Sequence, residues 1–428
     1  MKFLTVTQGC KVNHCDSEVI SQCMVSKGYE PAEDGEAPDI IIVNSCTVTE
    51  NSDKKGFRII SKLRRDYPEA VVVLTGCYPQ AFPQEAAENG NADIIVGNAS
   101  KESIPELVGE FLRSGKAEFV CKSHSRVFDE GSEFSHTKNT RAYIKIEDGC
   151  DRFCSYCIIP KARGRVRSKD IERIGAEVRF HAEDGHKEVV LTGINLSCYG
   201  TDIGLSLYDA VRTAADHPLI ERVRLSSLEP ELLTSELIEK LAGIEKLCPH
   251  FHLSLQSGCS STLRRMNRHY SAEEYREIVG GLRKAFPGCG ITTDIMVGFA
   301  GETEEEFRQS CEFVRSIGFA KVHVFTYSVR AGTAAAKMQN QIAAKVKERR
   351  YKVMSEIAES ARIEFWGRNI GTVHKVLIER QASPEFINGY TENYIPVRIY
   401  DGKAKRHDII AVEITGAEKE FCCGRETT

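Results

Sequence analysis

Short apolar runs separated by amphipathic stretches dominate the first part of the chain. Four such runs cover residues 3–7, 39–43, 70–74 and 93–96. The stretches between them, such as 17–27 and 53–66, have the apolar spacing of helices that bury one face. Strands that alternate with helices pair in parallel. Residues 1–121 are therefore predicted to form an N-terminal parallel α/β domain.

A polar stretch follows this region, and residues 122–135 are predicted to be a linker. Six further strand-like runs then alternate with helical segments, at 141–146, 188–191, 222–225, 251–255, 291–296 and 322–327. Six strand–helix units are too few for a closed eight-fold barrel. We therefore predict a partial (β/α)6 barrel over residues 136–366, with its functional residues at the carboxyl ends of the strands.

The pattern changes to period two near residue 367. Apolar and polar residues alternate over 372–378, 393–400 and 409–414, and Asp401-Gly402 is typical of a tight turn. This predicts a small β-barrel over residues 367–428, a fold that often binds nucleic acid. The whole chain is thus predicted to be an α/β protein with three domains.

The composition restricts the setting in which the protein works. The 428 residues carry a net charge of −4, so RNA would have to be held by local basic patches. The sequence shows no apolar leader with a cleavage site and no long uncharged apolar stretch, which predicts a cytoplasmic protein with no membrane partner. In a reducing compartment the 16 cysteines are expected to be free, catalytic or metal-bound.

Three cysteines fall within eight residues directly after the first strand of the predicted barrel. Cys150, Cys154 and Cys157 have the spacing C-x3-C-x2-C, and no fourth Cys or His lies near them in the sequence. Structural zinc sites use four protein ligands, whereas a four-iron cluster can be held by three thiolates and keep one iron open. The spacing therefore favours a cluster with a reactive iron.

A second set of three cysteines is dispersed over the N-terminal region. Cys10, Cys46 and Cys77 each stand just beyond the carboxyl end of a predicted strand, after Gln-Gly, Asn-Ser and Thr-Gly respectively. Parallel strands place these ends at one edge of the sheet, where ligands collect. We expect the three thiols to meet there and to form a second cluster site.

Polar residues at other strand ends of the predicted barrel are candidates for binding a cofactor. A bound cofactor needs hydrogen-bond donors, hydrogen-bond acceptors and an apolar wall at such positions. The candidate cofactor-binding residues are Thr192, Gly193, Asn195, Ser226, Ser227, Gln256 and Asp294.

A row of cations follows the first cysteine loop, with Lys161, Arg163, Arg165, Arg167 and Lys169 at every second position. In an extended segment all five would point to one side, where they could track a phosphate backbone or form an ordinary solvated face. Three of them, Arg163, Arg165 and Arg167, are candidate RNA-binding residues. Arg398 in the predicted C-terminal barrel is a fourth.

The chain resembles the methylthiotransferases of the radical S-adenosylmethionine (SAM) superfamily. The resemblance covers nearly every residue and is carried by residues 8–13, 149–160, 253–258 and 298–307. It implies a C-terminal TRAM-type barrel, SAM as cofactor, and two 4Fe-4S clusters held by the two cysteine sets. Lys11-Val12-Asn13 is similar to the MtaB-type branch, which methylthiolates N6-threonylcarbamoyladenosine beside the tRNA anticodon.

The same resemblance implies the division of work and the partners. Reductive cleavage of SAM at the Cys150, Cys154 and Cys157 cluster would give a radical that activates C2 of the adenine, and the other cluster would deliver sulfur. The expected partners are the tRNA anticodon loop, an electron donor such as flavodoxin or ferredoxin, and a sulfur source, with the protein acting as a monomer.

Three alternatives remain open from the sequence. The substrate could be isopentenyladenosine in tRNA or an aspartate of a ribosomal protein. In a different class, the chain could be a non-catalytic metal-binding protein that binds RNA.

Overall fold

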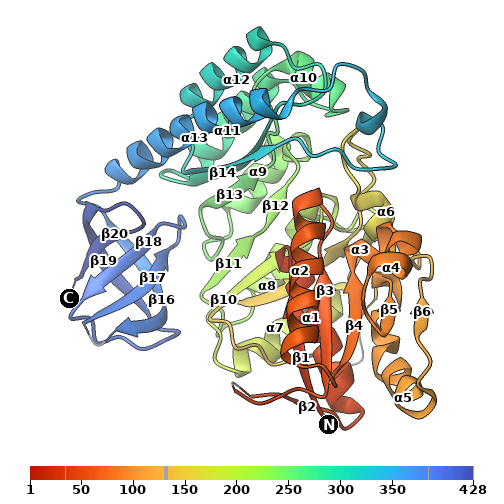
Figure 1. The fold of residues 1–428 in the computed structure, drawn as a ribbon. Helices are drawn as coiled ribbons and strands as arrows, with labels where there is room; N and C mark the ends of the chain where they lie inside the picture. Colours follow the sequence, from red (N-terminus) through yellow and green to blue (C-terminus); the bar gives the residue numbers. More distant parts are fainter. Residues whose placement is uncertain (34, 130–133, 384, 428) are drawn as a thin grey trace.

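Three structural units follow one another along the chain, and the middle one lies between the other two (Figure 1). The computed structural model describes residues 1–33, 35–129, 134–383 and 385–427. Within these residues, no helix combines the length and the apolar composition that a membrane crossing requires.

The N-terminal unit is a six-stranded parallel sheet with the order β2-β1-β3-β4-β5-β6. Its strands are β1 (Lys2–Thr7), β2 (Glu30–Pro31), β3 (Ile40–Ser45), β4 (Val71–Gly76), β5 (Ile94–Val96) and β6 (Glu118–Val120). Its helices are α1 (Lys11–Ser26), α2 (Glu50–Asp66), α3 (Cys77–Ala81), α4 (Pro83–Asn89) and α5 (Ile104–Ser114). The four predicted strands are confirmed. The edge strands β2 and β6 were not predicted, because both are short and lack an apolar run.

Both faces of this sheet are buried, as the continuous apolar runs require. Ile41 and Val43 of β3 face α2 and α3, whereas Ile40 and Ile42 face α1 and α5. The first of these two cores also includes Ile158 beside the Cys157 loop. The central unit therefore packs directly on the N-terminal sheet.

The central unit is an open barrel in which parallel strands alternate with helices. The strands are β7 (Ala142–Lys145), β10 (Glu188–Thr192), β11 (Arg222–Leu225), β12 (Ser227–Leu228), β13 (His250–Leu253), β14 (Gly290–Val297) and β15 (Lys321–Thr326). The helices are α7 (Ile171–Glu183), α8 (Leu207–Ala215), α9 (Ser235–Ala242), α10 (Ser260–Arg265), α11 (Ala272–Ala285), α12 (Glu304–Ile317) and α13 (Ala344–Gly367).

All six predicted strands of this unit are confirmed. The third is β11, which joins the sheet β11-β10-β7, and after Ser226 the chain forms the unpredicted short strand β12, which joins the sheet β12-β13-β14-β15. Among the described residues, β7 and β15 each pair with one neighbour, so the barrel stays open between them.

The C-terminal unit is a closed five-stranded barrel with the order β16-β17-β18-β20-β19. It consists of β16 (Val373–Ser383), β17 (Phe386–Thr391), β18 (Pro396–Tyr400), β19 (Ile409–Ala417) and β20 (Cys422–Glu426). β17 was not predicted, because the Asn388-Gly389 pair within it is typical of a turn. Gly389 instead allows a close approach of strands, since a Cβ there would lie 2.4 Å from the Leu377 carbonyl oxygen. β20 was also not predicted.

The described part of the predicted linker, residues 122–129 and 134–135, contains no helix or strand. Its Phe128 is buried, and the ammonium groups of Lys145 and Lys169 lie about equally close to its ring, at 5.4 and 5.5 Å. The segment therefore lies against the central unit. The domain boundaries remain predictions.

Candidate active site

The Cys150, Cys154 and Cys157 loop runs between the short strand β8 (Glu147–Asp148) and the helix α6 (Ile159–Arg163). Cys150 N–H donates to the Gly164 carbonyl at 3.0 Å, and Cys157 N–H donates to the Cys154 carbonyl at 2.9 Å. Gly149 has φ +88°, and a Cβ there would lie 1.9 Å from the Arg165 carbonyl oxygen. The glycine thus permits the tight fold that gathers the three thiols.

Polar donors from the barrel reach two of these thiols. Arg268 donates to Cys154 Sγ at 3.3 Å, and the Asn195 amide lies 3.9 Å from Cys150 Sγ. Burial raises the pKa of the Cys150 thiol to about 11 and that of Cys157 to about 12. Iron binds the thiolate, so a cluster here would displace the thiol protons.

The second set of thiols gathers at the carboxyl edge of the N-terminal sheet. Cys10 precedes α1, Cys46 follows β3, and Cys77 begins α3 after β4. Asn13 Oδ1 lies 4.0 Å from Cys10 Sγ and 3.7 Å from Cys77 Sγ. Cys46 approaches Gly9 so closely that a Cβ on this glycine would lie 3.0 Å from the Cys46 Cβ. The structure therefore brings together the three cysteines that are far apart in the sequence.

Arg163 connects this second set to the central unit. Its side chain is fully buried, and it donates to Cys77 Sγ at 3.3 Å and to Asn13 Oδ1. Its guanidinium also lies 2.7 Å from Asp16 of α1 and 3.2 Å from Asp148 of β8. The prediction that Arg163 binds RNA is wrong, because acidic residues and a thiol enclose the guanidinium completely.

The expected one-sided row of cations does not form. Residues 159–163 are helical, Gly164 turns the chain at φ +75°, and Arg167 and Lys169 are 95% buried, at 5% exposure each. The buried Arg167 guanidinium donates to the carbonyl oxygens of Arg163 and Arg165. The prediction that Arg167 binds RNA is therefore wrong as well. Arg165 remains exposed and lies over the Phe153 ring.

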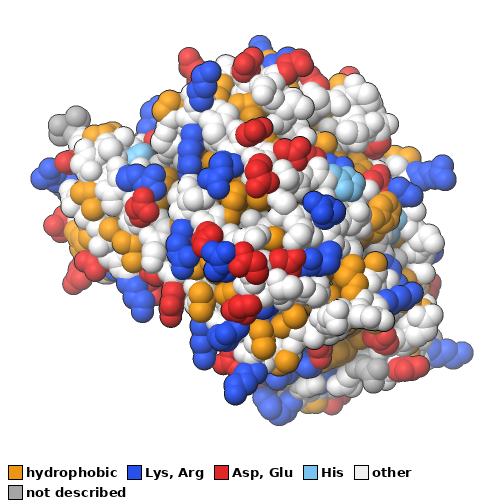
Figure 2. Space-filling view, turned by 90° about the horizontal axis from the view of Figure 1, so that it is seen from above, with side chains coloured by type: hydrophobic (Ala, Val, Ile, Leu, Met, Phe, Trp, Pro, Cys, Tyr) orange, Lys and Arg blue, Asp and Glu red, His pale blue; other side chains and the backbone are white. Residues whose placement is uncertain are grey.

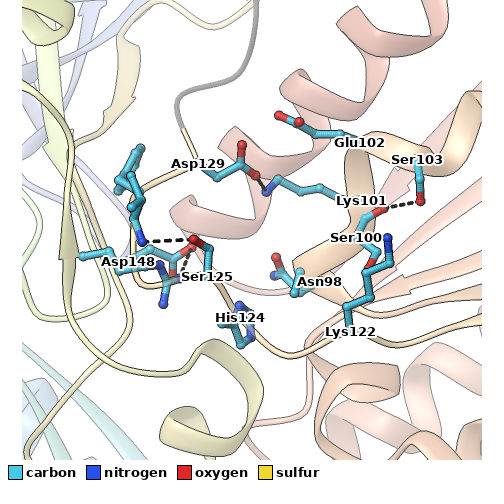
Figure 3. A pocket seen from close by; sticks show the side chains of 14 residues that line it. Asn98, Ser100, Lys101, Glu102, Ser103, Lys122, His124, Ser125, Asp129 and Asp148 are labelled. Atoms are coloured by element: carbon cyan, nitrogen blue, oxygen red, sulfur yellow. Dashed lines mark hydrogen bonds and ion pairs between the residues drawn. The ribbon is translucent and has the colours of Figure 1, made fainter.

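A pocket of about 400 Å³ borders this buried charge network. Figure 3 shows Asp129 beside Lys101 in one part of the pocket and Asp148 in another. Lys101 and Asp129 form an ion pair, and Lys145 of β7 lies 2.7 Å from Asp16. Both cations thus stabilise carboxylates at the junction of the two units.

Most of the candidate cofactor-binding residues line one cavity of about 830 Å³, where all three units meet. Cys10 lines it from the N-terminal sheet, and Tyr394 lines it from the C-terminal barrel. From the central barrel, the lining includes the predicted cofactor-binding residues Thr192, Gly193, Ser226, Ser227 and Asp294. One cavity therefore joins a cysteine of the second set to the strand ends of the barrel.

Comparisons with known proteins agree with this arrangement. Residues 144–314 match the Radical SAM superfamily, and residues 2–97 match a family described as Uncharacterized protein family UPF0004. The chain is 36% identical to "Threonylcarbamoyladenosine tRNA methylthiotransferase MtaB" of Aquifex aeolicus, over 93% of this chain and 96% of that protein. The chain belongs to the radical SAM methylthiotransferase family.

Two further similarities fit this membership. The methylthiotransferase is 32% identical to "tRNA-2-methylthio-N(6)-dimethylallyladenosine synthase" of Pelotomaculum thermopropionicum, over 99% of this chain and 97% of that protein. Its fold is similar to the radical S-adenosylmethionine methyltransferase TsrM from Kitasatospora setae, with a TM-score of 0.58 and 15% identity over 90% and 80% of the two chains. The fold class predicted from the sequence is thus confirmed.

The methylthiotransferase is a transferase that uses SAM and two 4Fe-4S clusters. The residues fit such clusters, since each set gathers three thiols beside an arginine and an asparagine. Within the described chain, no three His, Cys, Asp or Glu side chains are close enough to hold a single metal ion. The assignment of the six individual cysteines as cluster ligands remains a prediction.

Two of the predicted cofactor-binding residues lie outside the lining of the central cavity. Asn195 stands beside Cys150 instead. Gln256, at φ +66°, bonds through its backbone to Asp294 and Met296 and so connects neighbouring strands of the methylthiotransferase. Arg398, in β18, lies between the rings of Phe386 and Phe421, at 4.0 and 3.8 Å.

Sequence reasoning missed a polar wall in the same cavity, formed by Lys11 and three histidines, His250, His252 and His323. Thr292 Oγ1 lies 3.0 Å from His252 Nδ1 and 3.2 Å from His250 Nε2, and His252 Nε2 lies 3.3 Å from Asp294. The sequence signal was the alternation His250-Phe251-His252 within a strand, which places both histidines on one face.

Burial and the nearby guanidinium groups of Arg224 and Arg141 lower the pKa of the Lys11 ammonium to about 8. Burial, followed by Arg224, likewise lowers the pKa of His250 below its usual range. Both shifts reflect the burial of these two groups and the positive charge around them.

Proposed function

We propose that this methylthiotransferase modifies C2 of N6-threonylcarbamoyladenosine at position 37 of tRNA, next to the anticodon. Both relatives are named for a methylthio group on a tRNA adenosine, and their names differ in the adenosine substituent. The relative named for threonylcarbamoyladenosine is 36% identical, compared with 32% for the one named for dimethylallyladenosine.

The observation that carries the proposal is the central cavity and its polar wall. An apolar dimethylallyl group gains its binding energy from apolar surface. Lys11, His250, His252 and His323 instead offer charge and hydrogen bonds, which suit a threonylcarbamoyl group with its carboxylate and hydroxyl.

When bound, the two clusters would supply the electron that cleaves SAM and the sulfur that is transferred, held by Cys150, Cys154 and Cys157 and by Cys10, Cys46 and Cys77 respectively. Arg268 and Arg163 would each place positive charge beside one thiolate of their set. The cavity, which all three units line, would limit the access of bulk water to the reacting adenine.

Thr192, Gly193, Ser226, Ser227 and Asp294 would hold SAM at the strand ends, with Asn195 beside the cluster loop. The polar groups available there include Thr192 Oγ1, which is buried and has no hydrogen-bond partner among the described residues. Gln256 would act indirectly, through the backbone position of Asp294.

The tRNA would reach the cavity along a groove of about 840 Å³ between β15, α13 and the C-terminal barrel. This groove shares Lys321, Phe325 and Tyr394 with the central cavity. Its other aromatic and basic side chains include Tyr351, Tyr390, Arg362 and Lys419. Aromatic faces and cations in one groove suit an unstacked single-stranded loop.

Elsewhere the charges are mixed. On the face seen in Figure 2, basic and acidic side chains are interspersed. Arg165 and Arg398 remain candidate contacts for RNA. An electron donor such as flavodoxin or ferredoxin, a sulfur source and a second SAM molecule as methyl donor would complete the reaction.

The test is mass spectrometry of tRNA nucleosides from a strain that lacks the gene. Loss of the methylthio form of threonylcarbamoyladenosine, restored by the wild-type gene and not by Cys46→Ala, supports the proposal. An unchanged profile refutes it. Loss of the methylthio form of isopentenyladenosine instead would favour that substrate, and an unmodified ribosomal-protein aspartate would favour the protein substrate.

A further inference from the structure

The wall of the central cavity carries more positive than negative side chains. Its formally charged members are Lys11, Lys321 and Asp294, and Asp294 is already paired with His252 at 3.3 Å. Lys321 is exposed, whereas Lys11 is half-buried. Lys11 is therefore the less exposed of the two lysines that line the cavity.

No acceptor among the described residues lies within hydrogen-bonding or ion-pair distance of the Lys11 ammonium. By contrast, the two buried arginines that act on Lys11 are both paired, since Arg141 and Arg224 lie 3.0 and 2.7 Å from Glu188. A partly buried ammonium without an anion loses part of its hydration without compensation. The position of Lys11 thus calls for an anion that this part of the chain does not itself provide.

A second observation points to a ligand in the same place. His250 is 95% buried, at 5% exposure, and its Nδ1 has no hydrogen-bond partner among the described residues. Its other nitrogen lies 3.2 Å from Thr292 Oγ1, and its ring lies 4.7 Å from that of Tyr394. Buried polar atoms are nearly always paired, so the free nitrogen marks a place where a polar group binds.

We propose that Lys11 pairs with the carboxylate of the threonyl group of the substrate and so selects threonylcarbamoyladenosine over neutral N6-substituents. The inference rests on the proposed function. An α-carboxyl group is ionised at neutral pH, and a hydrogen bond between an ammonium and a carboxylate in a partly buried site is among the stronger polar contacts. His250 and His252 then face the remaining polar atoms of the substituent.

The experiment uses full-length protein with verified iron content and two anticodon stem-loop RNAs. One carries N6-threonylcarbamoyladenosine, and the other carries its carboxamide, which has the same shape and no charge. The wild type is expected to bind the acid about 10- to 100-fold more tightly than the amide. Lys11→Met is expected to reduce this ratio to about 1, while Lys11→Arg keeps most of it.

Lys240→Gln serves as the matched control, because Lys240 is exposed on α9 and paired with Glu236. It is expected to keep the wild-type ratio. Equal binding of acid and amide by the wild type would overturn the inference, whether or not the Lys11 variants load their clusters. So would a wild-type ratio in Lys11→Met.

The outcomes separate this inference from the proposed function. If the wild type methylthiolates the threonylcarbamoyladenosine RNA but binds acid and amide equally, the role of Lys11 fails and the proposed function stands. If the wild type methylthiolates only isopentenyladenosine RNA, the proposed function fails and the inference fails with it.

Discussion

The two cysteine sets reach the same arrangement by opposite routes. Cys150, Cys154 and Cys157 belong to one loop, whose glycine and backbone hydrogen bonds fold it locally. Cys10, Cys46 and Cys77 come from three strand ends that only the folded sheet brings together. The first site is thus encoded by spacing and the second by topology, so the second is expected to be more sensitive to the stability of its domain.

The sets also differ in where their arginine comes from. Arg268 and its thiol, Cys154, belong to the same unit. Arg163 belongs to the central unit, but it bonds to Cys77 and Asp16 of the N-terminal unit. The thiol environment of the second set is therefore complete only when the two units are docked.

The largest expected effect separates the sets by removing one thiol from each. Cys154→Ala is expected to abolish reductive cleavage of SAM. The cluster that drives this cleavage needs three thiols, and only two remain in the variant. Cys46→Ala is expected to retain this cleavage and to lose only the methylthio product. The measurement is 5′-deoxyadenosine and modified nucleoside, quantified in the same reaction.

Cys423→Ala is the control for both variants, because Cys423 lies in β20 of the C-terminal barrel. It is expected to keep both activities. Equal loss of SAM cleavage in Cys46→Ala and Cys154→Ala would contradict the division of work between the sets.

A second prediction concerns the arginine that crosses between the units. Arg163→Met leaves Asp16 and Asp148 short of a buried counter-charge, which should lower the free energy of unfolding by about 3–5 kcal/mol. Iron at the N-terminal set should be lost while SAM cleavage persists. Iron content and thermal unfolding measure the two effects.

Arg165→Met is the matched control, since the Arg165 side chain is exposed and its contacts are the exposed Asp151 and the Phe153 ring. Its effect on the free energy of unfolding should stay within about 0.5 kcal/mol. Full iron content in Arg163→Met would show that the second set does not depend on the docked unit.

The contrast between the sets also explains what the sequence could predict. Local patterns identified the four central strands of the N-terminal sheet, the strands of the open barrel and the Cys150 loop, because period and spacing are local properties. The burial of Arg163 could not be predicted, since its partner Asp16 lies in another domain. The role of Lys11 in the cavity wall likewise depends on how three units meet.

A third prediction addresses the arginine of the local set. Arg268→Met removes the donor to Cys154 and the partner of Glu229 at 2.5 Å. Hydrogen bonds to charged groups contribute about 1.5–3 kcal/mol, so SAM cleavage should fall without disappearing. The N-terminal set should keep its iron, because Arg268 does not contact it among the described residues. Loss of iron from both sets would contradict this separation.

The smallest effect tests whether the dispersed set depends on its sheet. Ile42→Val in β3 and Ile291→Val in β14 remove the same methyl group from two fully buried positions, at 0% and 1% exposure. Each should cost about 0.5–1.5 kcal/mol. Ile42→Val should lower the denaturant concentration at which the Cys10, Cys46 and Cys77 site releases iron, because this site exists only while the sheet is folded. Ile291→Val should leave that concentration unchanged, and equal shifts for the two variants would mean that the sheet and the barrel unfold as one unit.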